Sequence, residues 1–317
     1  MKIRTAFTMI ELIFVIIIIG IIGKFGVEFM TQAYSNFLHT SINERLQSNS
    51  TYAVEFISKR LENRIKQSTI VKDAQGDFNP IHYGDNNNSD GAPVGDGIIL
   101  EWIGADVDGF RGNDTLPNWS GIIDIDPGVG TNILTSPDTN TTGINSMLAV
   151  LSTNGTTLSV SGSALSITDP AIFFVGAPNN SDTRANYGWS GIGAMTNQNT
   201  AMLRVQRVNA DITQFTPASG TLANVEVYEY YKFAWTAYAI EFDQTNSKLW
   251  LHYDYQPWTG EDLSNGNKEL IMDNVTTFRF TAVNTMIKIQ VCVGSDLIID
   301  KNSPNNGYSM CREKTIF

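Results

Sequence analysis

The sequence predicts an α+β protein in which one long N-terminal α-helix packs on an antiparallel β-sheet that carries a large β-rich insertion. A helical pattern of apolar residues starts near residue 7 and meets no proline before Pro80. Residues 77–224 alternate short β-rich runs with clusters of Gly, Asn, Asp and Thr, and residues 225–317 show the alternation of longer strands. At 317 residues the chain is long enough to bury such a core.

The N-terminus combines a short basic segment with an apolar helix. Residues 1–6 are basic, and from Phe7 to Gly23 the only charged side chain is Glu11. Hydropathy alone fits a signal-peptide core or a short transmembrane helix. An ordinary cleaved signal peptide does not fit, because no small-residue cleavage site follows the apolar run and the helical pattern continues past it. A carboxylate within a membrane segment is costly, so Glu11 is expected to have a function.

This N-terminal pattern resembles the processing signal of type IV prepilins and type II secretion pseudopilins. The matching residues are the basic leader 1–6 with its final Ala6, then Phe7 and Thr8, an aliphatic pair, Glu11 and the long apolar run. The resemblance implies that a prepilin peptidase cleaves between Ala6 and Phe7, and that Phe7 is then N-methylated. It also implies that Glu11 attracts the free N-terminal amine of a neighbouring subunit during assembly. Opposite charges in a low-dielectric medium attract strongly, which gives this role a physical basis.

Two positions depart from the family pattern. Ala6 stands where the family usually has Gly, and its small side chain should still permit cleavage. The helix-bending proline of many major pilins is missing, and residues 26–28 of this chain are Gly-Val-Glu.

We expect residues 7–30 to form the membrane or fibre-core segment and residues 31–76 to form the periplasmic half of the helix. The helix is predicted from about Phe7 to Val71, roughly 100 Å long at ~1.5 Å per residue. Its second half should pack on the globular domain through one apolar face. That packing face consists of Leu38, Ile42, Leu46, Ala53, Ile57, Leu61 and Ile65.

The β-rich parts of the chain carry no catalytic or binding motif that we recognise. In the insertion 77–224 the predicted strands lie at 97–103, 146–152 and 171–175. In the segment 225–317 the predicted strands lie at 225–242, 248–255, 269–272, 275–282 and 287–293. A C-terminal antiparallel sheet is therefore expected.

A second resemblance concerns these C-terminal strands. Residues 270–280 (LIMDNVTTFRF) and 287–291 are similar to the late strands of J-class minor pseudopilins and related minor pilins. The helix segment 57–65 (ISKRLENRI) fits the same group. The resemblance implies a minor subunit.

Cys292 and Cys311 are the two cysteines of the chain. In an exported protein such a pair predicts a disulfide, which would bound a loop as in many pilins; two unrelated buried thiols are the alternative. Closing a loop of this size would stabilise the fold by about 3 kcal/mol in the loop-entropy description.

Composition and motifs argue against several functions. The net charge of −11 disfavours broad contact with a nucleic-acid backbone. No nucleophile elbow, Gly-rich phosphate loop or Cys-x-x-Cys motif occurs, so no enzymatic activity is expected. His39, His82 and His252 lack the spacing of metal ligands, and we expect no metal site of this kind and no cofactor.

Two features leave alternatives open. Residues 85–91 and 106–109 cluster Asp and Asn oxygens that could hold calcium, but such turns form without metal, and the turn is the preferred interpretation. Aromatic residues at 228–235 and 250–258 either stack on a sugar or fill the contact between sheet and helix, and packing is preferred.

Together these features predict a minor pilin or pseudopilin, a structural subunit that assembles into, and initiates or caps, a type IV pilus or type II secretion pseudopilus. It would cross the bacterial inner membrane once, with its C-terminal domain in the periplasm, before it joins the fibre. The expected partners are prepilin peptidase, other pilin-like subunits and the inner membrane. The alternative function is a fibre-tip binding module, an adhesin or a receptor for secretion substrates, on a pilin anchor. The processing signal does not distinguish among secretion, adhesion, motility and DNA uptake.

Overall fold

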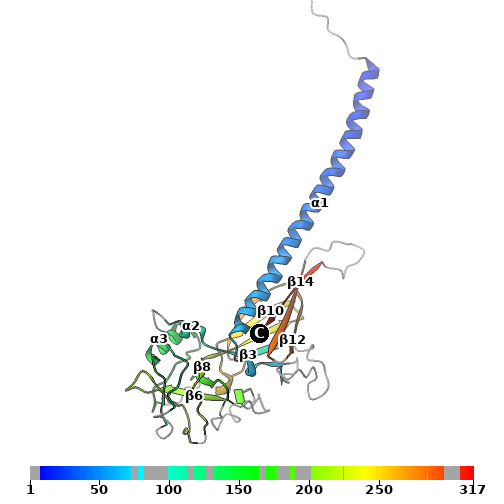
Figure 1. The fold of residues 1–317 in the computed structure, drawn as a ribbon. Coiled ribbons are helices and arrows are strands. Elements are labelled where there is room, and N and C mark those ends of the chain that lie inside the picture. Colours follow the sequence, from blue (N-terminus) through cyan, green and yellow to red (C-terminus); the bar gives the residue numbers. More distant parts are fainter. Residues whose placement is uncertain are drawn as a thin grey trace, which may run out of the picture.

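The computed structural model shows an α+β chain, as the sequence predicts (Figure 1). A long N-terminal helix projects from a body of antiparallel sheets, and the N-terminal end of that helix lies farthest from the sheets (Figure 1). The residues that the structure describes are 8–72, 78–81, 99–112, 117–125, 132–163, 169–177, 186–189, 201–223, 225–283, 285–295 and 308–317.

The helix α1 (Met9–Glu62) is continuous over 54 residues and about 80 Å long at ~1.5 Å per residue. It contains no proline, which would remove a hydrogen bond from the helix interior and bend or break the helix. Burial is confined to its second half, as expected, and begins at Leu46, whereas Leu38 is exposed. The buried side chains of α1 are Leu46, Ser50, Ala53, Val54, Ile57, Ser58 and Leu61.

The prediction that this helix reaches Val71 is wrong, because it ends at Glu62. Just beyond that point Arg64 forms an antiparallel β-bridge with Gly104, so sheet pairing replaces the helical hydrogen bonds. The elements that follow are a 3-10 turn (Lys66–Ser68) and the strand β1 (Ile70–Lys72).

Six antiparallel strands form the central sheet in the order β11-β10-β9-β3-β1-β2. Both of its faces are buried: Leu100 and Trp102 belong to the core on the side of α1, and Ile103 belongs to the core on the other side. Apart from β1, its strands are β2 (Phe78–Pro80), β3 (Ile99–Gly104), β9 (Thr236–Asp243), β10 (Lys248–Tyr253) and β11 (Asn267–Met272).

A three-stranded sheet covers the second half of α1. It consists of β12 (Val275–Val283), β13 (Met286–Gly294) and β14 (Ser309–Ile316), and Figure 1 shows it beside the helix. Lys314 of β14 reaches across to α1, with its Nζ 2.8 Å from Glu55 Oε2 and 3.8 Å from Glu62 Oε1. The predicted strands 275–282 and 287–293 are therefore confirmed, and β14 extends the sheet beyond them.

Cys292 and Cys311 form the predicted disulfide, and they lie opposite each other on β13 and β14. We expect the double substitution Cys292→Ser and Cys311→Ser to lower the free energy of unfolding by about 2–4 kcal/mol, because the unfolded chain loses a cross-link. Thermal unfolding of the full chain in detergent, followed by near-ultraviolet circular dichroism, measures the change. Wild-type protein treated with reductant is the control and should melt with the double variant. An unchanged melting temperature in both would contradict the prediction.

The insertion leaves and re-enters the central sheet at neighbouring positions, because Gly104 at the end of β3 pairs with Thr236 at the start of β9. Sheet pairing thus gives the insertion the bounds 105–235, where composition indicated 77–224. Figure 1 shows its elements at the end of the molecule opposite to the start of α1.

The insertion is a small closed antiparallel barrel. Its five-stranded sheet has the order β4-β7-β6-β5-β8, and the segment 120–125 joins the two edges. Ile122 bridges to Tyr230 next to β8, and Asp124 bridges to Thr135 of β4. The strands are β4 (Leu134–Thr135), β5 (Ala171–Phe174), β6 (Met202–Arg207), β7 (Gln214–Pro217) and β8 (Tyr231–Ala234). Packed aromatic side chains fill its interior: Trp119, Phe215, Tyr231 and Phe233.

Two short helices, α2 (Val107–Arg111) and α3 (Thr141–Leu151), flank the barrel. The prediction of a strand at 146–152 is wrong, because α3 covers most of it. The side chain of Asn140 starts this helix by accepting a hydrogen bond from the Gly143 N–H at 2.9 Å. The strand predictions at 97–103 and 171–175 are confirmed by β3 and β5.

Candidate assembly site

Glu11 lies in the first turn of α1 and is exposed. The Thr8 hydroxyl donates to Glu11 Oε2 at 3.4 Å, and the position at the positive end of the helix dipole suits a carboxylate. Ala6 and Phe7, the expected processing residues, lie outside the described residues. The Glu11 carboxylate is therefore exposed on a part of α1 that the rest of the described chain does not cover, and a cation from another molecule can reach it.

Among the described residues one helix, α1, is long and apolar enough to cross a membrane, and none of its most apolar window is buried in the chain. Large apolar side chains remain exposed from Met9 to Leu38. These 30 positions extend over about 45 Å, whereas the hydrocarbon layer of a bilayer is about 30 Å thick. The bilayer alone therefore does not cover all of the exposed apolar surface.

From Met30 on, the exposed apolar side chains of α1 lie on one side of the helix. We call this set, which consists of Met30, Tyr34, Phe37 and Leu38, the apolar stripe. Three of its members are 65–72% exposed, and at ~100° per residue all four fall within about a third of the helix circumference. Over the same turns the opposite side is polar and includes Gln32 and His39. Before Met30 the helix is apolar on more than one side, because the exposed rings of Phe25 and Phe29 lie opposite to the apolar stripe.

The apolar stripe points away from the body of its own chain. Continuing along α1 at ~100° per residue, the buried positions Leu46, Ile57 and Leu61 fall about half a turn from the middle of the stripe. The side of the helix that meets the chain's own sheet is therefore continuous with the polar side of residues 30–39. The stripe faces outward, where only another molecule can cover it.

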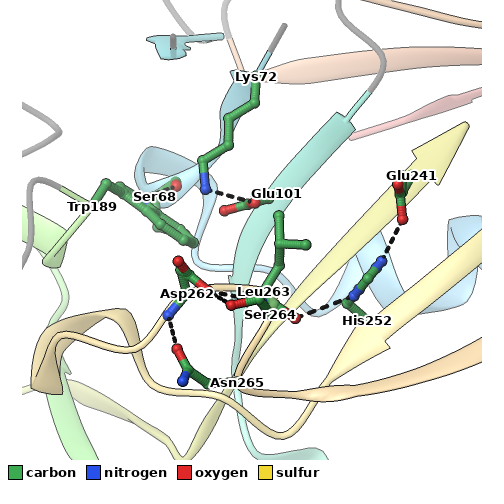
Figure 2. Close-up of polar contacts among 10 residues, drawn as sticks. All are labelled: Ser68, Lys72, Glu101, Trp189, Glu241, His252, Asp262, Leu263, Ser264 and Asn265. Atoms are coloured by element: carbon green, nitrogen blue, oxygen red, sulfur yellow. Dashed lines mark hydrogen bonds and ion pairs between the residues drawn. The ribbon is translucent and has the colours of Figure 1, made fainter. Parts of the chain in front are cut away.

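The structure describes two of the three histidines, His39 and His252. His39 is exposed on α1, and His82 lies outside the described residues. His252 is buried, with Nε2 2.7 Å from Glu241 Oε2 and Nδ1 3.2 Å from the Leu263 carbonyl oxygen (Figure 2). No group of three His, Cys, Asp or Glu side chains suited to a metal ion occurs in the part of the chain that the structure describes.

Of the two candidate calcium loops, residues 85–91 lie outside the described residues, and residues 106–109 form a helix start. Asp106 caps α2, with its Oδ1 2.9 Å from the Gly109 nitrogen, and the Trp119 indole N–H donates to Oδ2 at 3.2 Å. Both carboxylate oxygens thus accept bonds from the protein, which supports the interpretation of this segment as a turn.

Burial raises the pKa of Asp106 from 3.8 to about 6, against the opposing effect of the hydrogen bond from Gly109. Because the folded state holds this proton more tightly than the unfolded state, the resulting stability is full below pH 4 and is lost as pH rises through about 6. We expect Asp106→Asn, which cannot ionise, to gain stability relative to the wild type by about 2–3 kcal/mol between pH 4 and pH 7. Melting temperatures at constant ionic strength measure this difference, and a constant difference across the range would contradict it.

One buried polar contact lies within the central sheet, and another ties the insertion to the 3-10 turn that precedes β1. The Lys72 Nζ lies 2.9 Å from Glu101 Oε1 in the middle of the sheet, and the Trp189 indole N–H donates to the Ser68 carbonyl oxygen at 2.9 Å (Figure 2). Burial raises the pKa of Glu101, and the charge of Lys72 opposes that rise. The insertion is thus held on the body by specific contacts in addition to its two chain connections.

Asp254, directly after β10, accepts several hydrogen bonds from the insertion. The sequence analysis did not identify this residue. Its buried carboxylate accepts hydrogen bonds from the Ser152 hydroxyl at 2.8 Å and from the backbone N–H groups of Thr153 at 2.7 Å and Asn154 at 3.0 Å. Its backbone has φ +63°, a left-handed conformation that Asp and Asn tolerate best among non-glycine residues. The carboxylate therefore organises the loop after α3 on the end of the central sheet.

Comparisons with protein-family models, curated proteins and solved structures find no match to this chain.

Proposed function

We propose that this chain is a pilin-like structural subunit, a minor pilin or pseudopilin that assembles into a type IV pilus or type II secretion pseudopilus through α1. The observation that carries the proposal is the outward-facing apolar stripe on a helix that also spans a membrane by length and composition. Lipid would surround a helix on all sides, whereas residues 30–39 of α1 are apolar on one side and polar on the other. One-sided burial suits a neighbouring helix.

Glu11 then has a role in assembly. After cleavage behind Ala6, each subunit would carry a free amine at Phe7 and a carboxylate four residues later. In a bundle of such helices the amine of one subunit lies near the Glu11 of its neighbour when the two helices are offset along the fibre. Each charge then relieves the cost of burying the other in the membrane or fibre core.

The size and position of the insertion favour a minor subunit at the end of a fibre. The insertion 105–235 lies at the end of the molecule opposite to the start of α1 (Figure 1), and Glu11 stands in the first turn of that helix. In a shaft, each subunit's body meets the subunits above and below it, and a barrel at this position would obstruct the next subunit. At the tip no further subunit follows. In the cell the subunit would first stand in the inner membrane with its body in the periplasm.

The test is photo-crosslinking from matched positions on α1 in membranes of cells that make the whole machine. A crosslinking amino acid at Met30 or Phe37 samples the apolar stripe, and one at Gln32 or His39 samples the polar side of the same turns. We expect adducts with other pilin-like subunits from the first pair and few from the second. Equal yields from both sides, or no subunit adducts from the stripe, would overturn the proposal.

A second candidate function is a binding module on this anchor. The observation in its favour is that Tyr230 is exposed on the outer surface of the barrel. The other aromatic residues of 228–235 are wholly or mostly buried. Trp235 and Trp258 are buried, which favours packing for most of the aromatic residues that could have formed a sugar platform.

A further inference from the structure

A cavity of about 290 Å³ opens where the insertion joins the body of the chain. Both connections of the insertion line it, through Gly104 at the end of β3 and Thr236 at the start of β9. The last turn of α1 forms a second wall and α2 forms a third. We call this space the junction cavity. Its volume is close to the lower limit of ligand sites, about 300 Å³, so it can hold a small group such as one amino-acid side chain.

Three cations from two helices line the junction cavity. Lys59 and Arg60 belong to the last turn of α1, and Arg111 belongs to α2. Among the residues that the structure describes, none of the three forms an ion pair within 4.0 Å, although the whole chain carries a net charge of −11. Cations that share a cavity without a counter-charge attract an anion.

Aromatic rings hold Arg60 in place. Its guanidinium carbon lies 4.0 Å from the centre of the Phe56 ring and 6.0 Å from the centre of the Tyr238 ring. Rings contact the face of a guanidinium group, so its N–H edge stays available for a carboxylate. Gly104 makes room for this arrangement, because a Cβ at that position would lie 2.5 Å from Tyr238 Cε2 and would displace the ring.

Tyr238 adds a hydrogen-bond donor to the same wall. Its side chain lines the junction cavity, and its hydroxyl has no hydrogen-bond partner in the described part of the chain. Burial raises the pKa of Tyr238 to about 12, and the nearby charge of Arg60 opposes that rise. The hydroxyl therefore keeps its proton at neutral pH and can donate to an anion.

Two carboxylates also line the junction cavity, so its three cations leave a surplus of one positive charge. The Asp106 carboxylate accepts hydrogen bonds from the Gly109 N–H and the Trp119 indole, whereas Asp108 is exposed in the first turn of α2. A surplus of one charge suits an anion with a single negative charge. The two carboxylates and the acidic chain disfavour a ligand with more negative charge.

We propose that the junction cavity binds the carboxylate side chain of one acidic residue of a partner polypeptide. The carboxylate accepts hydrogen bonds from the N–H edge of Arg60 and from the Tyr238 hydroxyl, while Lys59 and Arg111 contribute their charge from exposed positions at the rim. Hydrogen bonds between arginine and a carboxylate are charge-assisted and among the strongest in proteins. A residue bound here contacts both α1 and the insertion. This inference goes beyond the fibre role and does not depend on it.

The test uses the full chain in non-ionic detergent micelles and two probes of nearly equal shape, N-acetylglutamate N-methylamide and N-acetylglutamine N-methylamide. Ligand-observed magnetic resonance measures their affinities. We expect the glutamate probe to bind about tenfold more tightly than the glutamine probe, as one charge-assisted contact would give. Arg60→Gln should remove most of this preference. Tyr238→Phe keeps the ring beside Gly104 and should weaken the glutamate probe about threefold, the effect of one hydrogen bond.

Arg45→Gln is the matched control, because Arg45 is exposed on the same helix and does not line the junction cavity. It should leave both affinities unchanged. If Arg60→Gln lowers the melting temperature, Tyr238→Phe and Arg111→Gln still test the site. Four outcomes would overturn the proposal: equal binding of the two probes, no binding of the glutamate probe at millimolar concentration, a loss in Arg45→Gln as large as in Arg60→Gln, or tighter binding of inorganic phosphate than of the glutamate probe.

Discussion

Replacing Asp254 by Ala is expected to lower the free energy of unfolding by about 3–5 kcal/mol, the range for breaking a buried, hydrogen-bonded charge site. The substitution leaves the Ser152 hydroxyl and the backbone N–H groups of Thr153 and Asn154 without their acceptor in a water-excluded place. Residue 254 also has φ +63°, and alanine tolerates this left-handed backbone conformation less well than aspartate does. Thermal unfolding of the full chain in detergent, with tryptophan fluorescence and near-ultraviolet circular dichroism, measures the loss.

Limited proteolysis distinguishes a local effect from a global one. Because Asp254 holds the loop after α3 on the central sheet, we expect new cleavage near residues 152–156 in Asp254→Ala before the C-terminal sheet is attacked. Asn has nearly the size of Asp and tolerates the same left-handed backbone conformation. Asp254→Asn should therefore lower the free energy of unfolding less than Asp254→Ala does. Asp243→Ala is the matched control, because the Asp243 carboxylate accepts hydrogen bonds from Asn246 in an exposed turn, and it should lower the free energy of unfolding much less than Asp254→Ala does. Equal stability of Asp254→Ala and Asp243→Ala would contradict this account of the loop.

Replacing Glu11 by Leu is expected to leave the chain inserted in the membrane and cleaved, and to reduce its incorporation into fibres at least tenfold. A Leu side chain suits the bilayer better than a carboxylate does, so insertion does not suffer. Assembly suffers because the neighbouring amine loses its counter-charge in a low-dielectric medium, where such a pair is worth several times more than in water. Quantitative immunoblotting of sheared fibres against total membrane protein measures the ratio.

The control for that experiment is Glu28→Leu. Glu28 lies on the same helix and is exposed, but it stands beyond the first apolar run and outside the apolar stripe. It should incorporate within about twofold of the wild type, since surface charges contribute little. Normal incorporation of Glu11→Leu would contradict the proposed role of Glu11, and equal loss in both variants would show a general need for charge on the helix.

The parts of the fold with strong periodic patterns could be predicted from the sequence. The long helix was predictable because its apolar residues recur at helical spacing without a proline, and the C-terminal strands because their alternation is regular. The disulfide was predicted from two cysteines in a chain that we expect to be exported, and the structure contains it. Glu11 stood out because it interrupts an apolar run.

The rest depends on contacts that are distant in sequence. Nothing local marks Glu62 as the end of α1, because the helix ends when Arg64 meets Gly104 forty residues later in the chain. The segment 146–152 is apolar and short, and such runs fit a strand or a buried helix equally well. The capping side chain of Asn140, which accepts from the Gly143 N–H, was the missed signal for α3.

The sequence predicted a β-rich insertion, but its bounds and the closure of its strands into a barrel could not be predicted. Composition changes near residue 77, but β3 at 99–104 belongs to the central sheet, and only its pairing with β9 shows this. Barrel closure rests on two isolated bridges from the segment 120–125. Asp254 follows an ordinary strand, and its importance comes from a loop about a hundred residues earlier.

The most direct measurement of the central claim is the intact mass of the chain extracted from the membranes and fibres of cells that also make a prepilin peptidase. If the chain is a pilin-like subunit, the mass corresponds to a protein that begins at Phe7, has lost residues 1–6 and carries one added methyl group, and fragmentation places that group on the Phe7 amine. Extracted chain that still carries residues 1–6, or that is cleaved elsewhere, would contradict the claim.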